Sequence, residues 1–140
     1  MNGKWSSIVV LMAAAALLIY QPSCARSQQL VSITVSPQGT TITLTGIGQQ
    51  VDTQFTALGN YIHPPETKDL TKTAAWSTDT PTIIYTVPGS PGLIRTSGNG
   101  CGTNLGVTAS VYTDNNNPSG NVVVGSATMN VSFGNGTTCP

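Results

Sequence analysis

Residues 68–106 decide the fold, and they read KDLTKTAAWSTDTPTIIYTVPGSPGLIRTSGNGCGTNLG. In the first part of this stretch the side chains alternate, so that Lys72, Ala74 and Trp76 share one side of a predicted strand. Two short runs follow at 82–87 and 93–96, and each ends in turn-forming residues. Three short strands separated by such turns predict an all-β sandwich.

The same alternation continues on both sides of this stretch. Residues 105–112 and 122–133 carry the cleanest pattern, and residues 31–36, 40–45 and 50–58 are further predicted strands. Residues 59–68 are predicted to be an irregular loop. The predicted inward positions are Val51, Thr53, Phe55 and Ala57 in the 50–58 strand, and Leu105, Val107, Ala109, Val111, Ala127, Met129, Val131 and Phe133 in the last two strands. About seven to nine short strands predict an immunoglobulin-like antiparallel β-sandwich, a single domain over residues 26–140.

Charge is scarce along the chain. The 140 residues suffice for one domain, and only 7% of them are charged, with a formal net charge of zero. A nucleic-acid binder of the basic-patch kind needs clustered Lys and Arg, so this class is excluded. The same scarcity of Lys and Arg argues against a polybasic membrane-surface protein. Low charge with abundant Thr, Ser, Asn and Gly is typical of extracytoplasmic β domains.

The N-terminus is typical of an export signal. Lys4 supplies a positive charge, and residues 8–20 form an apolar run of 13 residues, which suits a signal core and is too short to span a membrane. One interpretation is a signal peptide, residues 1–25, that is cut after Ala25. The other is a lipoprotein signal that ends before Cys24, which then carries the lipid. An uncleaved N-terminal anchor helix is the third alternative.

The cysteine count agrees with export. The chain has three Cys, and either processing event removes Cys24 or acylates it, which leaves Cys101 and Cys139. Because residues 105–112 and 122–133 are expected to pair antiparallel, the start of the first strand lies beside the end of the second. We therefore predict a disulfide between Cys101 and Cys139 at one end of the sandwich. Two unpaired thiols are the alternative, and two Cys without a nearby His make only half of a metal site.

The sequence holds no recognisable catalytic motif. His63 is the sole histidine, and no Ser, Cys or Asp in a triad motif accompanies it, so it is interpreted as a solvated loop residue. The acids are scattered over different turns: Asp52, Glu66, Asp69, Asp79 and Asp114. We therefore expect a protein that is not an enzyme and that holds no cofactor.

A few residues are candidates for binding. Trp76 is expected to be a core anchor, with ligand stacking as the alternative. Tyr85 and Tyr112 would offer faces for sugar stacking where they are exposed, although scattered surface aromatics are common. The loop at 114–117 is rich in oxygen ligands of the type that calcium prefers, and a plain solvated hairpin loop is the simpler interpretation.

Several segments, taken in order, resemble one known family. They are VSITVSP at 31–37, QFTALGNY at 54–61, DLT at 69–71, AWSTD at 75–79, GLI at 92–94 and GNGCGT at 98–103. Together they resemble the bacterial immunoglobulin-like domain, group 2, the module of invasin- and intimin-type surface proteins. The likeness covers nearly all of the chain after the export signal. The two prolines at 64–65 and the cysteine in the glycine-rich turn depart from the usual pattern.

The resemblance implies an exported, non-enzymatic module with a structural or adhesive role. The chain would be secreted or held at the bacterial surface, with contact to the membrane only through a lipid on Cys24. Its partner would be a protein or a glycan at the cell surface, and not a nucleic acid. The alternative function is a small carbohydrate- or metal-ion-binding protein that uses the loops at one end of the sandwich.

Overall fold

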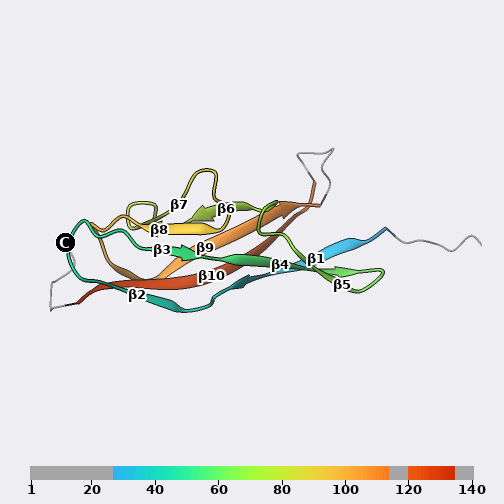
Figure 1. The fold of residues 1–140 in the computed structure, drawn as a ribbon. Helices are drawn as coiled ribbons and strands as arrows, with labels where there is room; N and C mark the ends of the chain where they lie inside the picture. The colour runs from blue at the N-terminus through green and yellow to red at the C-terminus, as the bar shows by residue number, and fades with distance from the viewer. Residues whose placement is uncertain (1–26, 114–119, 135–140) are drawn as a thin grey trace, which may run out of the picture.

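The chain folds almost entirely into strands in the computed structural model, which describes residues 27–113 and 120–134. The predicted all-β class is confirmed, because these residues form strands, turns and no helix. In chain order the strands are β1 (Gln29–Ser36), β2 (Thr40–Leu44), β3 (Asp52–Gln54), β4 (Thr56–Ile62), β5 (Glu66–Asp69), β6 (Ala75–Thr78), β7 (Ile84–Thr86), β8 (Leu93–Thr96), β9 (Gly102–Tyr112) and β10 (Val122–Phe133) (Figure 1).

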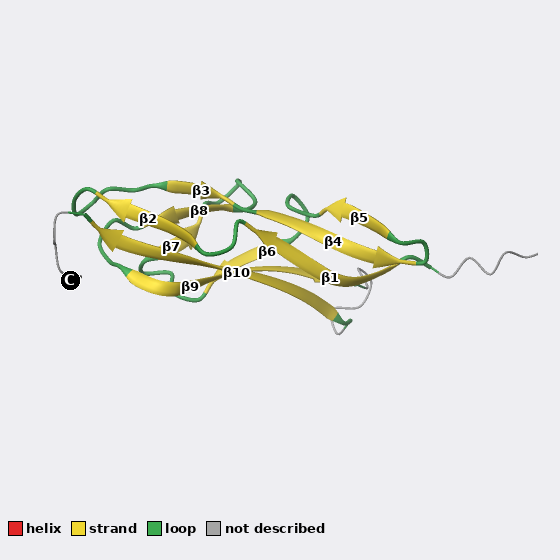
Figure 2. Cartoon of the chain, turned by 90° about the horizontal axis from the view of Figure 1, so that it is seen from below, coloured by secondary structure: helices red, strands yellow, loops and turns green. Residues whose placement is uncertain are grey.

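Two layers of strands make the sandwich. One layer is the sheet β2-β10-β9-β6. The other combines the sheets β1-β4-β5 and β3-β8-β7, which are joined because only Phe55 separates β3 from β4 (Figure 2). All strand pairs are antiparallel except β2 and β10, which run parallel, so the predicted antiparallel sandwich contains one parallel pair. After the turn that follows β1, the chain crosses to the β2-β10-β9-β6 layer, where β2 runs in the same direction as β10.

The predicted strand at 50–58 divides into two strands with different partners. Residues Asp52–Gln54 pair with β8, the amide of Phe55 donates to the carbonyl of Gly92 at 2.7 Å, and the chain from Thr56 onward pairs with β1. The predicted inner face is nevertheless confirmed at Phe55 and Ala57, which are fully buried, whereas Val51 and Thr53 are half-buried. The alternation of apolar and polar residues predicts which face of the sheet a side chain lies on. It does not predict which neighbouring strand the backbone hydrogen-bonds to.

The predicted irregular loop at 59–68 is wrong. Strand β4 continues to Ile62, β5 begins at Glu66, and the two form a hairpin in which Tyr61 pairs with Glu66. The two prolines lie in the turn between the strands, where they interrupt no ladder. His63 opens this turn with a φ of 59°, in the left-handed region, and its side chain is exposed. The hairpin explains in part why there are more strands than expected.

The predicted strand through Trp76 begins later than its alternation suggested. Residues 71–73 form a turn, in which the amides of Thr73 and Ala74 both donate to the carbonyl of Leu70, and β6 starts only at Ala75. Lys72 therefore lies exposed in the turn and is not part of a strand. Similarly, the predicted run at 82–87 is a strand only in its β7 part.

The core lies between the layers. Its fully buried large side chains are Phe55, Leu44, Ile84, Ile94, Met129, Val35 and Val107. The predicted inward positions on β9 and β10 are confirmed as buried, except that Val111 and Phe133 are half-buried. Among the described residues, every buried polar side-chain atom has a hydrogen-bond partner. Thr96 is an example, since its hydroxyl accepts the amide of Val51 at 2.9 Å.

The described part of the chain is elongated, and the chain enters and leaves it at opposite ends. We call the end where β1 begins the entry pole and the end where β10 finishes the exit pole (Figure 1). The β4–β5 turn and the end of β9 also lie toward the entry pole. No helix in residues 27–113 and 120–134 is long and apolar enough to cross a membrane.

Candidate functional site

A cleft opens near the entry pole between the two layers. It has a volume of about 630 Å³, which is within the roughly 300–1,000 Å³ of small-molecule sites. One layer contributes the lead into β1 and the end of β4, and the other contributes the start of β6 and the end of β9. Leu30 and Leu70 are its buried apolar residues. A site here would therefore draw on four segments that lie far apart in the sequence.

Two tyrosines line this cleft, one from each layer. Tyr61 on β4 is half-buried, and its backbone pairs with Leu30 on one side and Glu66 on the other. Tyr112 ends β9, where it pairs with Val122, and it remains 50% exposed. Backbone pairing in the strands fixes the positions of both residues, so the two tyrosines are carried by strands of the sandwich and not by a loop.

Most of the remaining lining is polar and all of it is neutral, with Ala75 and Val111 as its apolar members. It includes the side chains of Gln28, Gln29, Thr73 and Ser110, which come from the lead into β1, the turn before β6 and the end of β9. None of the described residues that line the cleft is charged. Hydroxyls and carboxamides both donate and accept hydrogen bonds, so the cleft can bind a ligand that carries groups of either kind.

A small charged network borders the cleft beside Tyr61. Gln28 donates to the Glu66 carboxylate at 2.7 Å and accepts from the Lys68 ammonium at 2.5 Å, while the Lys68–Glu66 distance is 3.2 Å. The Lys68 nitrogen lies 5.0 Å from the centre of the Tyr61 ring, a cation–π contact that holds the ring in place. The hydrogen bond from Gln28, followed by that from Lys68, lowers the pKa of the Glu66 carboxyl. Glu66 and Lys68 thus neutralise each other.

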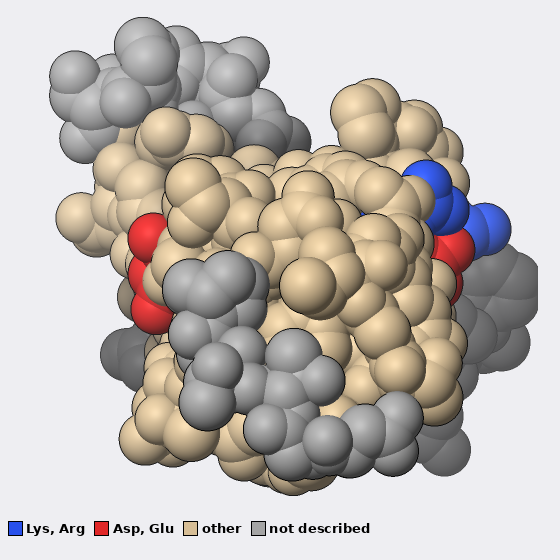
Figure 3. Space-filling model, turned by 90° about the vertical axis from the view of Figure 1, so that its left-hand side faces the viewer, with Lys and Arg blue, Asp and Glu red and all other residues tan. Residues whose placement is uncertain are grey.

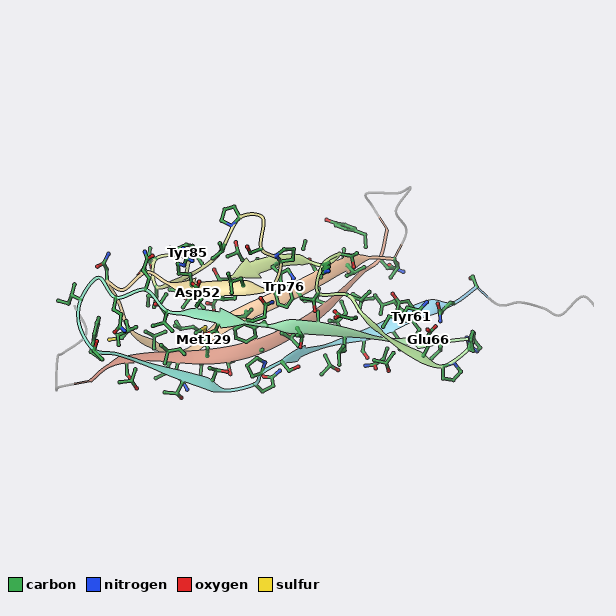
Figure 4. The ribbon with its side chains drawn as sticks, in the orientation of Figure 1. Asp52, Tyr61, Glu66, Trp76, Tyr85 and Met129 are labelled. Atoms are coloured by element: carbon green, nitrogen blue, oxygen red, sulfur yellow. The ribbon has the colours of Figure 1, made fainter. Side chains whose placement is uncertain are left out.

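Trp76 lies elsewhere, beside a smaller hollow of about 210 Å³ under the 87–92 turn. Its side chain is half-buried and packs against the edge of the hydrophobic core. Phe55 and Met129, by contrast, are fully buried, and Figure 4 shows Met129 among the core side chains. A role for Trp76 in anchoring the core fits this packing and stays a prediction.

The other predicted candidates do not converge on the cleft. Tyr85 lies on β7, well away from Tyr61, so only Tyr112 of the two predicted aromatic faces lines the cleft (Figure 4). His63 is in the β4–β5 turn. The described acids lie on separate elements, and no three His, Cys, Asp or Glu among the described residues lie close enough to hold a metal ion. Continuing the alternation from Phe55 past Ala57 would have placed Tyr61 on the inner face.

Two of these acids have clear partners of their own. Arg95 forms a bidentate ion pair with Asp52, in which Nε donates to Oδ1 at 2.6 Å and Nη2 donates to Oδ2 at 2.8 Å. This hydrogen bonding lowers the pKa of the Asp52 carboxyl. Thr71 lowers the pKa of the Asp69 carboxyl in the same way, first through its hydroxyl and then through its amide. Both pairs join neighbouring segments, so we interpret them as structural.

The predicted cysteine pair would lie at the exit pole. Cys101 is half-buried directly before β9, and the pairing of Gly102 with Val131 places it beside the last part of β10, as the predicted strand order required. Cys139 lies outside the described residues, and so do Cys24 and the oxygen-rich loop at 114–117. The disulfide and the lipid anchor therefore stay predictions.

No family model matches the chain, and no curated protein matches it either.

Proposed function

We propose that the chain is an exported, non-enzymatic, immunoglobulin-like module of the bacterial surface or secreted fraction, with a structural or adhesive role. The observation that carries this proposal is the path of the chain, which enters at one pole and leaves at the other (Figure 1). Domain termini often lie close together, an arrangement that suits insertion into another domain. A domain that the chain enters and leaves at opposite poles instead suits a spacer, which keeps whatever is attached at its two ends separated along its long axis.

The outer faces of the sandwich support an extracytoplasmic location. On β4, the Asn60 carboxamide donates to the hydroxyl of Ser32 at 3.1 Å and accepts from that of Thr67 at 3.2 Å. On the other layer, Asn104 and Asn130 are linked by a 2.8 Å hydrogen bond. Such neutral contacts respond little to salt, which screens exposed charges. Seen from the exit pole, most of the visible described surface is uncharged (Figure 3).

The position of Cys24 in the sequence determines how the module would be oriented at a membrane. Cys24 precedes the first described residue, Ser27, by three positions. If Cys24 carries a lipid, the entry pole and its cleft face the membrane and the exit pole faces outward. If the chain is cut after Ala25, neither pole is tied to a membrane. The mature N-terminus therefore decides which surface meets a partner.

Fractionation of a bacterial host that expresses the full chain tests the proposal. We expect the protein outside the cytoplasm, with a mature N-terminus at Cys24 or just after Ala25 when the purified protein is weighed by mass spectrometry. Cys24→Ser should abolish acylation if the lipoprotein interpretation holds, whereas Cys101→Ser, the matched control, should leave processing unchanged. A cytoplasmic protein with an intact N-terminus would contradict export.

A further inference from the structure

We infer that the entry-pole cleft binds a neutral saccharide, with Tyr61 and Tyr112 as its aromatic contacts. This inference gives the proposed adhesive role a ligand class and a place on the molecule. It rests on the proposed function only for its biological setting, because binding by the purified protein does not require export. The cleft combines three features that suit a saccharide: an open cleft of sufficient volume, neutral hydrogen-bonding groups and aromatic side chains.

The chemistry of the lining selects a neutral, hydroxyl-rich ligand. Gln29 presents a carboxamide, and Thr73 and Ser110 present hydroxyl groups. The two hydroxyls donate to the carbonyls of Leu70 and Ala75, so their oxygens are left to accept from a sugar hydroxyl, which can donate as well as accept. A wholly apolar ligand would strip water from these groups without replacing their hydrogen bonds, which is unfavourable. An ionic ligand would find no opposite charge among the described lining residues.

The charges nearest to the cleft do not change this selection. Glu66 and Lys68 are 3.2 Å apart, and Gln28 bonds to both, so their charges compensate each other at the border of the cleft. An anion that bound Lys68 would have to displace Glu66, and a cation that bound Glu66 would have to displace Lys68. A neutral ligand leaves the pair intact.

The two tyrosines give the cleft its aromatic faces. Aromatic rings carry partial negative charge on their faces, and the C–H groups of a sugar ring are weakly positive, so the two surfaces attract. Tyr61 is held by its ladder and by Lys68 on its ring, and Tyr112 keeps half of its surface exposed on the opposite layer. A ligand between the layers would thus meet the Tyr61 ring on one wall and the exposed Tyr112 ring on the other.

Titration of the full chain, purified in mild detergent, with neutral oligosaccharides tests the inference. The probes are gluco-, xylo-, galacto- and N-acetylglucosamine oligomers, with an acidic uronic-acid oligomer for comparison. Backbone amide shifts in a ¹⁵N spectrum report where a probe binds. We expect at least one neutral probe to shift Gln28, Tyr61, Ser110 and Tyr112 together, and the acidic probe to shift none of them.

Three variants separate a specific site from a general surface effect. Tyr112→Ala removes an exposed ring and should weaken binding by about fivefold or more, while Tyr112→Phe keeps the ring and should bind within about twofold of the parent. Tyr85→Ala, the matched control on β7, should leave affinity unchanged. Far-UV circular dichroism confirms that each variant is folded before its affinity is compared.

Three results would overturn the inference. One is that no neutral probe binds at concentrations up to about 10 mM. A second is that shifts occur only on the outer sheet faces. A third is that a folded Tyr112→Ala variant binds as the parent does. These results concern the ligand alone, because failure of the export proposal would appear in the fractionation and not in this titration.

Discussion

The indole N–H of Trp76 donates a 2.9 Å hydrogen bond to the backbone carbonyl of Thr71. Thr71 is itself buried, its amide donates to the Asp69 carboxylate at 2.8 Å, and its hydroxyl accepts the amide of Ala57 at 2.9 Å. One threonine in the turn before β6 thus links the end of β5, the start of β4 and the indole of Trp76 on β6. Trp76 is bound through this residue to the opposite layer.

Two substitutions at Trp76 separate packing from hydrogen bonding. Trp76→Ala should lower the free energy of unfolding by about 3 kcal/mol, the low end for buried aromatics, because the ring is only half-buried. Trp76→Phe keeps most of the packing and loses the bond to Thr71, so we expect a loss of about 1 kcal/mol. Urea denaturation measures both, and a Trp76→Ala variant as stable as the parent would show that Trp76 is no anchor.

Thr71→Val should be more harmful than its small change in shape suggests. Valine cannot accept the amide of Ala57, which is then buried without a partner, at a cost of about 1–3 kcal/mol. Thr43→Val on the exposed face of β2 is the matched control and should change stability by less than about 0.5 kcal/mol. Equal denaturation midpoints for the two variants would refute the role of the hydroxyl.

Gly125→Ala should disrupt the contact between β1 and β10. A Cβ at this position would lie 2.4 Å from the backbone carbonyl oxygen of Ile33, which cannot move without shifting β1. We expect a loss of about 1–3 kcal/mol or more in thermal or urea unfolding. Gly46→Ala, where nothing lies within 4 Å of the new Cβ, is the control and should unfold much as the parent does. A harmless Gly125→Ala would mean that β1 approaches β10 less closely.

Acid should destabilise the protein through its hydrogen-bonded carboxylates. The pKa values of Asp52 and Asp69 are lowered from 3.8 by Arg95 and Thr71, respectively. The folded state therefore binds these protons less readily, so stability is fully present above the unfolded pKa and is lost as pH falls below it. Asp69→Asn keeps an acceptor oxygen but does not titrate, so its melting temperature should fall less than that of the parent between about pH 5 and pH 2. Parallel curves for the two proteins would contradict this assignment.

The predicted Cys101–Cys139 disulfide should be visible as missing thiols. Thiol counting on the unfolded, unreduced mature protein is expected to find neither of these two groups free. The bridge would close a loop of about 38 residues and stabilise the fold by about 4 kcal/mol in the chain-entropy model. Reduction should therefore lower the melting temperature, whereas it should leave that of a Cys101→Ser, Cys139→Ser double variant unchanged. Two reactive thiols would disprove the bridge.

The sequence by itself determined the strand class and the faces of most strands. Phe55, Val107 and Met129 could be assigned to the core because alternation is a local property, set by the geometry of an extended chain. The turns that close the predicted runs at 82–87 and 93–96 were equally local. The export signal and the cysteine count are also properties of the sequence alone, and they remain predictions.

Only the tertiary structure decided which strands became neighbours. The change of partner at Phe55, the parallel pairing of β2 with β10 and the β4–β5 hairpin all depend on backbone hydrogen bonds between distant residues, which leave no trace in the side-chain pattern. The cleft follows from the same choices, since Tyr61 and Tyr112 are 51 positions apart and meet only because the two layers end together at the entry pole.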